Sequence, residues 1–318
     1  MNKFFSYEIN ELKLDSLFIE YLKAYSNISN KLNYFQLNNN NKNIISPFNT
    51  HYINEKKFIS FYNEPIKIYS SSNICFDEYL IFHKFFKKFN KIIKFQFQID
   101  NVLFQKNLHT IKHLPFSQIF ETQKIDLKPS LDVIFSKFKR DLKERIKQAE
   151  KNIQIKIEIY DYKNYKEGLI KEMQLLHEVV SGKKTRSDNT WKINEKMIKC
   201  KKGFILKLLI NNKAISYSLF FHNNSHGITF SSCTLRKYFK IAGINHLIKW
   251  IGISYLKKKG VRYYDIGITN YLNLSGRSKI TEKERNIAYF KSRFNGIKFY
   301  HLQSNELLSL ENFKKLFE

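Results

Sequence analysis

The clearest pattern in the chain is an apolar stripe with helical spacing, which begins just after Pro129. Its members recur every three or four residues: Leu131, Ile134, Phe138, Leu142, Ile146 and Ala149. That spacing places all of them on one face of a helix, so we predict a single helix over residues 131–149. Lysines and arginines fill much of the remaining surface, which is typical of a solvated helix face.

Downstream of Gly203 the spacing changes from helical to the pattern of buried strands. GFILKLLI and KAISYSLFFH are apolar runs joined by two asparagines. A two-residue connection of this kind predicts a β-hairpin. After the polar stretch HNNSH, GITFSSCT follows as a third strand.

A second apolar helical stripe comes after these strands. It consists of Ile244, Leu247, Ile248, Ile251, Tyr255 and Leu256. The helix is predicted to end in KKKG, because lysines stabilise the negative end of a helix and Gly260 suits a left-handed cap. VRYYDIG then reads as a strand. A strand, a helix and a strand of these lengths predict a crossover between parallel strands, and therefore an α/β fold with a mixed sheet.

The first third of the chain alternates between the two kinds of pattern. Residues Asp77 to Phe89 are predicted to form a helix, and Lys91 to Ile99 a strand. The asparagine-rich stretch from Leu37 to Asn43 is predicted to be a surface loop.

Composition bounds the class of protein. With 318 residues, of which 43% are hydrophobic, the chain is long and apolar enough for two globular domains. The net charge of +27 comes from 47 lysines and only 8 arginines. Lysine spread over a whole surface is weaker support for a nucleic-acid partner than an arginine stripe. The charge therefore indicates an anionic partner without naming it.

Other features of the sequence limit the chemistry. Cys75, Cys200 and Cys233 are far apart, which argues against a disulfide framework or a cysteine-rich zinc site. His222 and His226 flank a polar turn with no acidic ligand nearby, so no metal site is predicted. No apolar run approaches the ~20 residues of a membrane span, and acidic residues interrupt the first segment. We therefore expect the protein in the cytoplasm.

Asp265 is the most informative polar residue, because it lies in the middle of the apolar strand VRYYDIG. A buried carboxylate is costly unless it is paired or hydrogen-bonded. Two interpretations follow. Asp265 either acts at the end of the strand on an acceptor amine, or it is a structural acid that bonds to a turn or to Arg262.

The order of four stretches resembles the FemAB-like branch of the GNAT acyltransferase superfamily. These stretches are KFKRDLKERIKQAEKN, GFILKLLINNKAISYSLFF, HLIKWIGISYLKKKGVRYYDIG and ERNIAYFKSRFNG. Together they lie within about residues 122–296. The resemblance implies a mixed GNAT-type sheet, with two GNAT-like domains in tandem: residues 1–118, and residues 119–318 as the acyltransferase domain.

The resemblance also implies a catalytic centre. In this fold two parallel strands separate near the middle of the sheet, and a donor arm or acceptor inserts between them. Here the strands are GITFSSCT and VRYYDIG, which carry Ser232 and Tyr264 as predicted substrate-binding residues. The FK pair of the family matches Phe290 and Lys291, and Lys291 is predicted to stabilise the oxyanion. Asp265 is the candidate that orients or deprotonates the amine.

The segment before the crossover helix is the candidate for binding anions. Arg236 and Lys240 are predicted to bind substrate there. Where GNAT enzymes have the coenzyme A loop [Q/R]xxGx[G/A], this chain has Lys240-x-x-Gly243-x-Asn245, in which only the central glycine matches. Gly243 and Asn245 are the predicted cofactor-binding residues. This departure weakens the case for acetyl-CoA and leaves the donor open between acetyl-CoA and aminoacyl-tRNA, with no tightly bound cofactor.

Three functions remain open after these observations. The first is transfer of an aminoacyl or acyl group to an amine of a cell-envelope precursor, either a peptidoglycan stem or an amino-sugar nucleotide. The second is an acetyl-CoA-dependent N-acetyltransferase acting on an amino sugar. The third belongs to another class: a non-catalytic basic protein that binds RNA or an anionic membrane.

Overall fold

The computed structural model describes most of the chain in eleven ranges. These are residues 16–26, 32–39, 42–53, 56–61, 65–67, 69–70, 76–89, 92–114, 116–152, 154–272 and 280–317. The N-terminal residues 1–15 and Cys75 lie outside them.

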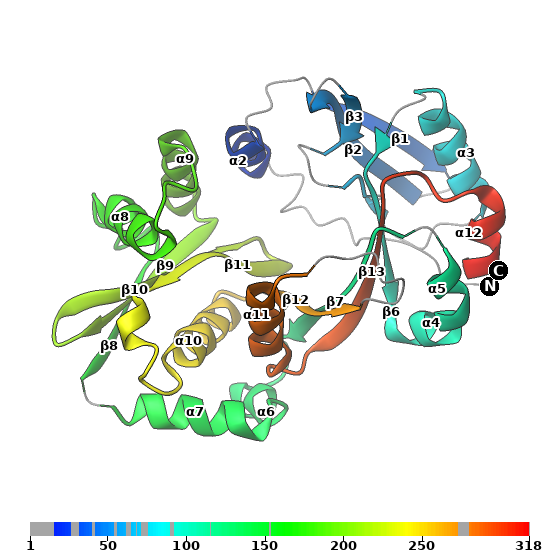
Figure 1. Ribbon diagram of the computed structural model, residues 1–318. Coiled ribbons are helices and arrows are strands. Elements are labelled where there is room, and N and C mark those ends of the chain that lie inside the picture. The colour runs from blue at the N-terminus through cyan, green and yellow to red at the C-terminus, as the bar shows by residue number, and fades with distance from the viewer. Residues whose placement is uncertain are drawn as a thin grey trace.

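A small sheet occupies the N-terminal part of the chain (Figure 1). Its strands are β1 (Asn33–Asn39), β2 (Lys42–Ile53), β3 (Lys56–Ser60), β4 (Tyr69–Ser70) and β5 (Ile92–Ile93). They run in the order β1-β2-β3-β5, and β4 pairs with β2. Helix α3 (Phe76–Lys87) covers this sheet, and its Phe82 and Phe86 rings pack edge-on or tilted against Phe35 and Phe48.

A larger sheet of eight strands forms the rest of the molecule. In spatial order its strands are β6 (Phe95–Asp100), β13 (Ile297–Ser304), β7 (Gln118–Asp126), β12 (Tyr263–Leu272), β11 (His226–Thr234), β10 (Lys213–His222), β9 (Gly203–Ile210) and β8 (Ile155–Tyr160). Neighbouring strands are antiparallel except β11 and β12, which are parallel. The sheet is therefore mixed, as predicted.

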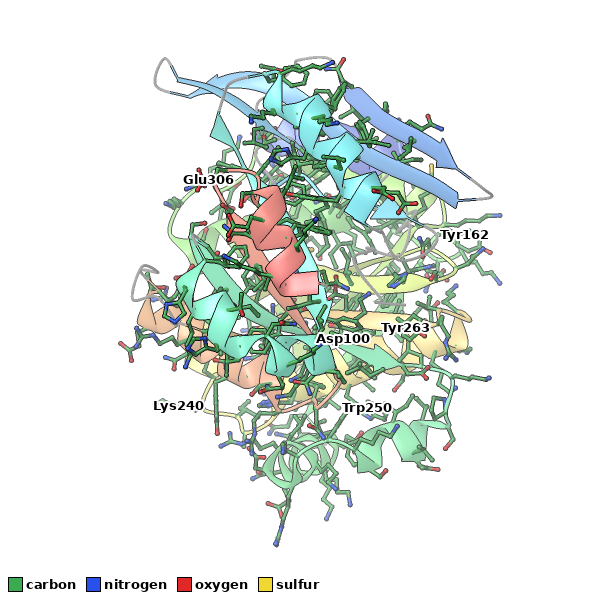
Figure 2. The ribbon with its side chains drawn as sticks, turned by 90° about the vertical axis from the view of Figure 1, so that its right-hand side faces the viewer. Asp100, Tyr162, Lys240, Trp250, Tyr263 and Glu306 are labelled. Atoms are coloured by element: carbon green, nitrogen blue, oxygen red, sulfur yellow. The ribbon has the colours of Figure 1, made fainter. Side chains whose placement is uncertain are left out.

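Helices cover both faces of this sheet (Figure 1). One face carries α6 (Leu131–Ser136), α7 (Arg140–Glu150), α10 (Ile244–Lys258) and α11 (Glu282–Ser292); the other carries α2 (Ser16–Ser26), α8 (Leu169–Ser181) and α9 (Asp188–Lys199). Alternate residues of β9 explain the two layers, because Phe204 and Leu206 pack toward α10 while Ile205 packs toward α8 and α9. Trp250 of α10 contacts the rings of Phe135 and Phe138 (Figure 2).

Short helices complete the chain. They are α4 (Asn101–Lys106), α5 (Leu108–His113), α12 (Leu310–Phe317) and the 3₁₀ turn η1 (Arg236–Tyr238).

Several local predictions are confirmed. Residues 77–87 of the predicted N-terminal helix are helical. Asn211 and Asn212 connect β9 to β10 with φ angles of 50° and 60°, the left-handed backbone that a two-residue hairpin needs. Helix α10 ends as predicted, with Gly260 at φ 78° and the Val261 N–H bonded to the Leu256 carbonyl.

Three local predictions are wrong. The stripe over residues 131–149 forms two helices, α6 and α7, because the backbone between them bonds elsewhere: the Lys139 N–H donates to the Arg293 carbonyl, and Asn295 donates to the Lys137 carbonyl. The asparagine-rich stretch is strand on both sides of residues 40–41, which lie outside the described residues, with Asn38 opposite Asn43. The predicted strand over residues 91–99 is split, because residues 92–93 form β5 and residues 95–99 belong to β6 in the other sheet, while residue 91 lies outside the described residues.

Residues near the C-terminus complete the N-terminal core. Tyr300, Leu308 and Phe313 belong to the same buried cluster as residues of β1, α3 and β6. The Tyr79 hydroxyl donates to the Leu308 carbonyl at 2.7 Å, and its ring stacks on Phe313 with centroids 3.9 Å apart. The predicted domain boundary at residues 118 and 119 falls at the start of β7 and stays a prediction.

Gly252 allows α10 to lie close to the sheet. A Cβ atom built on Gly252 would lie 2.1 Å from Cζ of Phe220 on β10. Phe220 is fully buried and stacks flat on Phe204, with centroids 4.9 Å apart, so it has little room to move.

We therefore expect Gly252→Ala to destabilise the fold by about 1–3 kcal/mol through overpacking, despite the higher helix propensity of alanine. Chemical denaturation measures the change. Ser254→Ala on the same helix is the matched control and should stay within about 0.5 kcal/mol of the unaltered protein. A Gly252→Ala variant as stable as the control would contradict the close approach.

Candidate functional site

The parallel strands β11 and β12 pair only briefly. Their register joins His226 to Tyr263, Gly227 to Tyr264 and Ile228 to Asp265, and no further pairs follow. Beyond this point β11 continues along β10, and β12 continues along β7. The two strands therefore separate in the middle of the sheet, at the strands where the sequence resemblance implied an opening.

Lys291 lies beside this opening. It projects from α11, whose N-terminus is fixed by a capping box between Thr281 and Glu284. Its Nζ atom is 2.9 Å from the position that a Cβ would take on Gly267, so the end of the lysine side chain occupies the space beside this glycine. Burial lowers the pKa of Lys291, and the nearby charge of Asp265 acts in the opposite direction.

Phe290 packs beneath the same helix rather than into the opening. Its ring contacts His246 at 4.5 Å and Phe294 at 5.9 Å between centroids. Phe290 of the predicted FK pair is thus brought against the first turn of α10.

Asp265 bonds to its own strand. Its Oδ1 accepts a hydrogen bond of 2.7 Å from the Gly267 N–H, at the point where the register of β12 with β7 shifts. Gly267 has a φ of +81° there. Arg262 pairs with Asp126 and not with Asp265. The hydrogen bond expected of a structural acid is therefore present, while action on an amine stays a prediction.

The predicted substrate-binding residues lie in different environments. Tyr264 is fully buried, and its hydroxyl is 2.6 Å from Thr229 Oγ1. Ser232 is exposed on the separated part of β11 and bonds to Ser218 at 2.9 Å. Arg236 and Lys240 are exposed in and after η1. Tyr264 is thus part of the core, while the other three side chains reach solvent, and their role in binding substrate stays a prediction.

Gly243 and Asn245 both have structural explanations at the start of α10. Gly243 has a φ of +79°, and a Cβ on it would lie 1.9 Å from the carbonyl oxygen of Arg145 in α7. The Asn245 side chain accepts a hydrogen bond of 2.9 Å from Thr234. Helix packing therefore accounts for the glycine, and the cofactor role of both residues stays a prediction.

The sequence interpretation missed Lys249. This lysine is only 8% exposed, and its Nζ donates to Thr229 Oγ1 at 2.8 Å, at the first residue of β11 beyond the paired region. Burial, helped by the positive charge of Lys291, lowers the pKa of Lys249 to about 7. The signal was available, because Lys249 shares a helical face with Gly252, Ile253 and Leu256.

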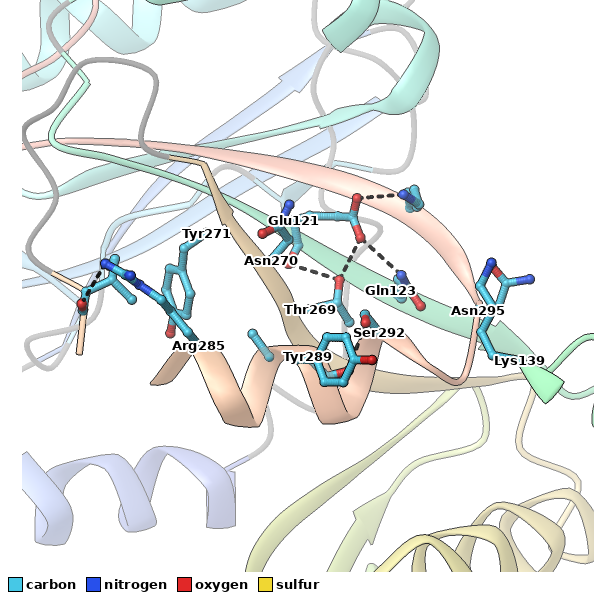
Figure 3. Close-up of a pocket in the computed structure, with 13 residues that line it drawn as sticks. Glu121, Gln123, Lys139, Thr269, Asn270, Tyr271, Arg285, Tyr289, Ser292 and Asn295 are labelled. Carbon is cyan, nitrogen blue, oxygen red and sulfur yellow. Dashed lines mark hydrogen bonds and ion pairs between the residues drawn. The ribbon is translucent and has the colours of Figure 1, made fainter. Parts of the chain in front are cut away.

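A pocket of about 700 Å³ lies between α11 and the sheet (Figure 3). Strands β7 and β12 contribute Glu121, Gln123 and Thr269, while α11 contributes Tyr289 and Ser292. Thr269 is two residues from Gly267, and Ser292 follows Lys291. The pocket is therefore adjacent to the opening, and no sequence motif indicated it.

Glu121 anchors the polar floor of this pocket. It accepts hydrogen bonds from Gln123 and Thr269 and pairs with Lys298 at 2.9 Å. Burial alone would raise the pKa of Glu121, but the hydrogen bonds from Lys298, Gln123 and Thr269 outweigh it and hold the pKa below its ordinary value. The pocket is lined by one carboxylate, that of Glu121, and by three cationic side chains, those of Lys139, Arg285 and Lys298. Its net charge is therefore positive.

Metal sites and membrane-spanning helices are two further classes of feature that the described residues bear on. Among the described residues, no group of three or more His, Cys, Asp or Glu side chains is arranged to hold a metal ion. None of the described helices combines the length and the apolar character that crossing a bilayer requires.

No protein-family model and no curated protein matches the sequence, whereas several solved structures match the fold. FemX superposes with a TM-score of 0.59 at 11% identity, over 91% of this chain and 91% of that chain. L-PGS from Bacillus licheniformis gives 0.53 at 13% identity, over 99% and 97%. The C-terminal domain of a putative lysylphosphatidylglycerol synthetase from Agrobacterium fabrum gives 0.50 at 9% identity, over 86% of each chain.

At identities this low the comparison concerns the fold. The predicted fold class, an α/β fold with a mixed sheet, is confirmed, and so is the FemAB-like resemblance at the level of the fold, while the division into two GNAT-like units stays a prediction.

His246 reports on the packing of Phe290. Burial, with Arg145 and Arg293 helping and Asp141 opposing, lowers the pKa of His246 to about 4. Between the ordinary value of 6.5 and this value, the unfolded chain holds a proton that the folded protein lacks, so the free energy of unfolding falls as the pH falls.

We expect His246→Gln to remove this loss. Between about pH 7 and 4.5, the free energy of unfolding should fall by about 2–3 kcal/mol less in the variant than in the unaltered protein. Denaturant titrations at both pH values measure the difference. His113→Gln, at an exposed histidine, is the control. Parallel pH dependence in all three proteins would show that His246 is not held neutral against Phe290.

Proposed function

We propose that the protein is a cytoplasmic N-acyltransferase, which moves an aminoacyl or acyl group from an ester or thioester onto an amine of a cell-envelope precursor. The observation that carries the proposal is the opening between β11 and β12, with Lys291 held beside Gly267. The fold shared with FemX and L-PGS supports it as an analogy, because a fold by itself does not fix a function.

The reaction requires an electrophilic group near the reacting carbonyl. Attack of an amine on an ester or thioester places negative charge on the carbonyl oxygen. Lys291 supplies a cation in a partly desolvated position, where an electrostatic interaction is stronger than in water. Asp265 favours the charged form of Lys291, so the carboxylate supports the role of the ammonium group.

The opening suits an extended donor arm. No strand pairing joins β11 to β12 beyond Ile228 and Asp265, so an inserted arm can bond to the facing backbone edges as an added strand would. Both aminoacyl-tRNA and acetyl-CoA present a reactive carbonyl at the end of a flexible chain. The packing of Gly243 against Arg145 accounts for that glycine without a pyrophosphate, which favours the aminoacyl donor.

The pocket beside α11 suits the acceptor. Its net positive charge favours an anionic molecule, such as a peptidoglycan stem carried on a nucleotide or an amino-sugar nucleotide. Its polar side chains offer hydrogen bonds to hydroxyl and amide groups. Because Thr269 and Ser292 line the pocket close to Gly267 and Lys291, an amine extending from it reaches the opening.

Lys291→Met should lower kcat by about 10²–10³-fold, the usual effect of removing a group that stabilises an oxyanion. Lys283→Met, at an exposed lysine on the same helix, should have no effect. Transfer is measured with acetyl-CoA or a charged tRNA pool as donor and a UDP-linked muropeptide or amino sugar as acceptor. If kcat falls equally in the two variants, Lys291 has no specific role in stabilising the oxyanion.

A thermal-shift series with the same ligands tests the function itself, because a ligand that binds only the folded protein stabilises it. Stabilisation by the UDP-linked acceptor or by tRNA, with acetyl-CoA silent, supports aminoacyl transfer. Stabilisation by acetyl-CoA identifies an amino-sugar N-acetyltransferase instead. Salt-sensitive binding of generic RNA alone, without turnover, identifies a non-catalytic binding protein.

A further inference from the structure

Lys249 lies inside the protein at the point where the sheet opens. It comes from α10 on one face of the sheet and reaches Thr229, the residue after the last paired position of β11. Its Nζ lies about equally far from two aromatic rings, 6.0 Å from the centroid of Phe220 and 5.9 Å from that of Tyr264. An apolar helix face thus delivers one amine to the base of the opening.

The hydrogen-bond partners of Lys249 are neutral. It donates to the Thr229 hydroxyl, which is also bonded to the Tyr264 hydroxyl. Burial raises the pKa of Tyr264, so that hydroxyl stays protonated. Within the described ranges Lys249 forms no ion pair with a carboxylate. A charged amine would therefore lack compensation, whereas a neutral amine satisfies the site and keeps a free electron pair.

Lys249 and Lys291 have different electrostatic surroundings. Lys291 receives support from Asp265, while Lys249 is surrounded by apolar rings and lies within the influence of the Lys291 charge. Neighbouring groups whose surroundings move their pKa values apart are the usual arrangement for dividing acid and base roles. Burial lowers the pKa of both lysines, but a nearby carboxylate opposes that shift only at Lys291, so Lys291 is the better placed of the two to carry the charge and Lys249 to be neutral.

We propose that Lys249 is the general base of the acyl transfer, and that it takes the proton from the attacking amine at the opening between β11 and β12. This assignment rests on the proposed function and adds to it a general base for the attacking amine. Asp265, the other candidate, already accepts a hydrogen bond from the Gly267 N–H. In the strand register Asp265 is paired with Ile228, and because side chains alternate along a strand, the Thr229 side chain lies on the other face of the sheet.

The proton balance is as follows. The acceptor nitrogen forms a bond to the carbonyl carbon while the electron pair of Lys249 Nζ takes a proton from that nitrogen. The tetrahedral intermediate then collapses, and the bond from carbon to the leaving oxygen or sulfur breaks. The Lys249 ammonium returns the proton to that leaving atom, so the protein ends in its starting state.

The protonation state of Lys249 can be tested without any substrate. Trace labelling with acetic anhydride, read at Lys249 by mass spectrometry, follows the neutral amine across about pH 5 to 11. We expect a midpoint of about 7, against the ordinary 10.5 of a lysine. A midpoint near the ordinary value overturns the proposal, because the amine would be charged at neutral pH.

Activity tests the role directly. Lys249→Met preserves the length and apolar stem of the side chain and should lower kcat by about 10²–10⁴-fold. Lys249→Arg should be equally impaired, because arginine stays charged. Lys258→Met, at an exposed lysine of the same helix, is the matched control and should keep full activity. In the unaltered protein kcat/KM should fall as the pH drops through about 7, and this limb should be absent from the residual activity of Lys249→Met.

Stability separates a catalytic lysine from a structural one. Lys249→Met should melt no lower than the unaltered protein, since it replaces a buried amine with an apolar side chain. If the unaltered protein transfers acyl groups and Lys249→Met keeps the same rate and the same pH profile, the base assignment fails and the proposed function stands. If the unaltered protein transfers no acyl group to any acceptor, the proposed function fails, and the base role falls with it.

Discussion

The bulge in β12 at Asp265 and Gly267 is the constraint on which the site depends. A bulge bends its strand and increases the local twist. Here it follows the last residue that pairs with β11, and the Asp265 carboxylate holds it through the Gly267 N–H. The bend coincides with the departure of β12 from its parallel neighbour, and the absence of a side chain at Gly267 leaves the space that Lys291 Nζ occupies. One acidic side chain thus lies both where the two strands separate and within electrostatic reach of Lys291.

The two lysines at the opening follow from the same geometry. A separated pair of strands leaves a region that is neither packed core nor open solvent, and helices α10 and α11 each direct one amine into it. Such a region cannot hold two unpaired positive charges cheaply, because the local dielectric is low. Burial lowers the pKa of both amines, and a nearby carboxylate opposes this shift only at Lys291. The pocket next to α11 also holds a buried charge, that of Glu121, and there hydrogen bonds compensate for the cost of burial.

The sequence predicted those parts of the fold that depend on local pattern. The β9–β10 hairpin followed from two asparagines, and α10 followed from its apolar stripe and Gly260, because turn and cap residues act on their own backbone. The resemblance to FemAB-like proteins, which rests on the order of these elements, also implied which strands separate and pointed to Lys291 and Asp265 as candidates. The catalytic roles of these residues remain predictions.

Features that depend on distant contacts were not predictable in this way. Helix α6 ends at Ser136 because the loop after α11 bonds to the backbone at Lys137 and Lys139, and no local pattern encodes that contact. The pocket requires strands β7, β12 and β13 to meet α11, so its lining is scattered through the sequence. Lys249 was locally visible as a lysine on an apolar face, but only its position against Thr229 distinguishes it from a lysine that reaches solvent.

The stacking of Phe313 on Tyr79 has a consequence for how the chain is made. The bond between Tyr79 and Leu308 joins residues 229 positions apart, so the N-terminal core still lacks one wall when its own strands have left the ribosome. Contacts between residues so far apart in the sequence form slowly, because the chain must lose the entropy of closing a long loop before the contact can stabilise it. Until those contacts form, part of the aromatic surface of α3 lacks its partner, and transiently exposed apolar surface of this kind favours aggregation.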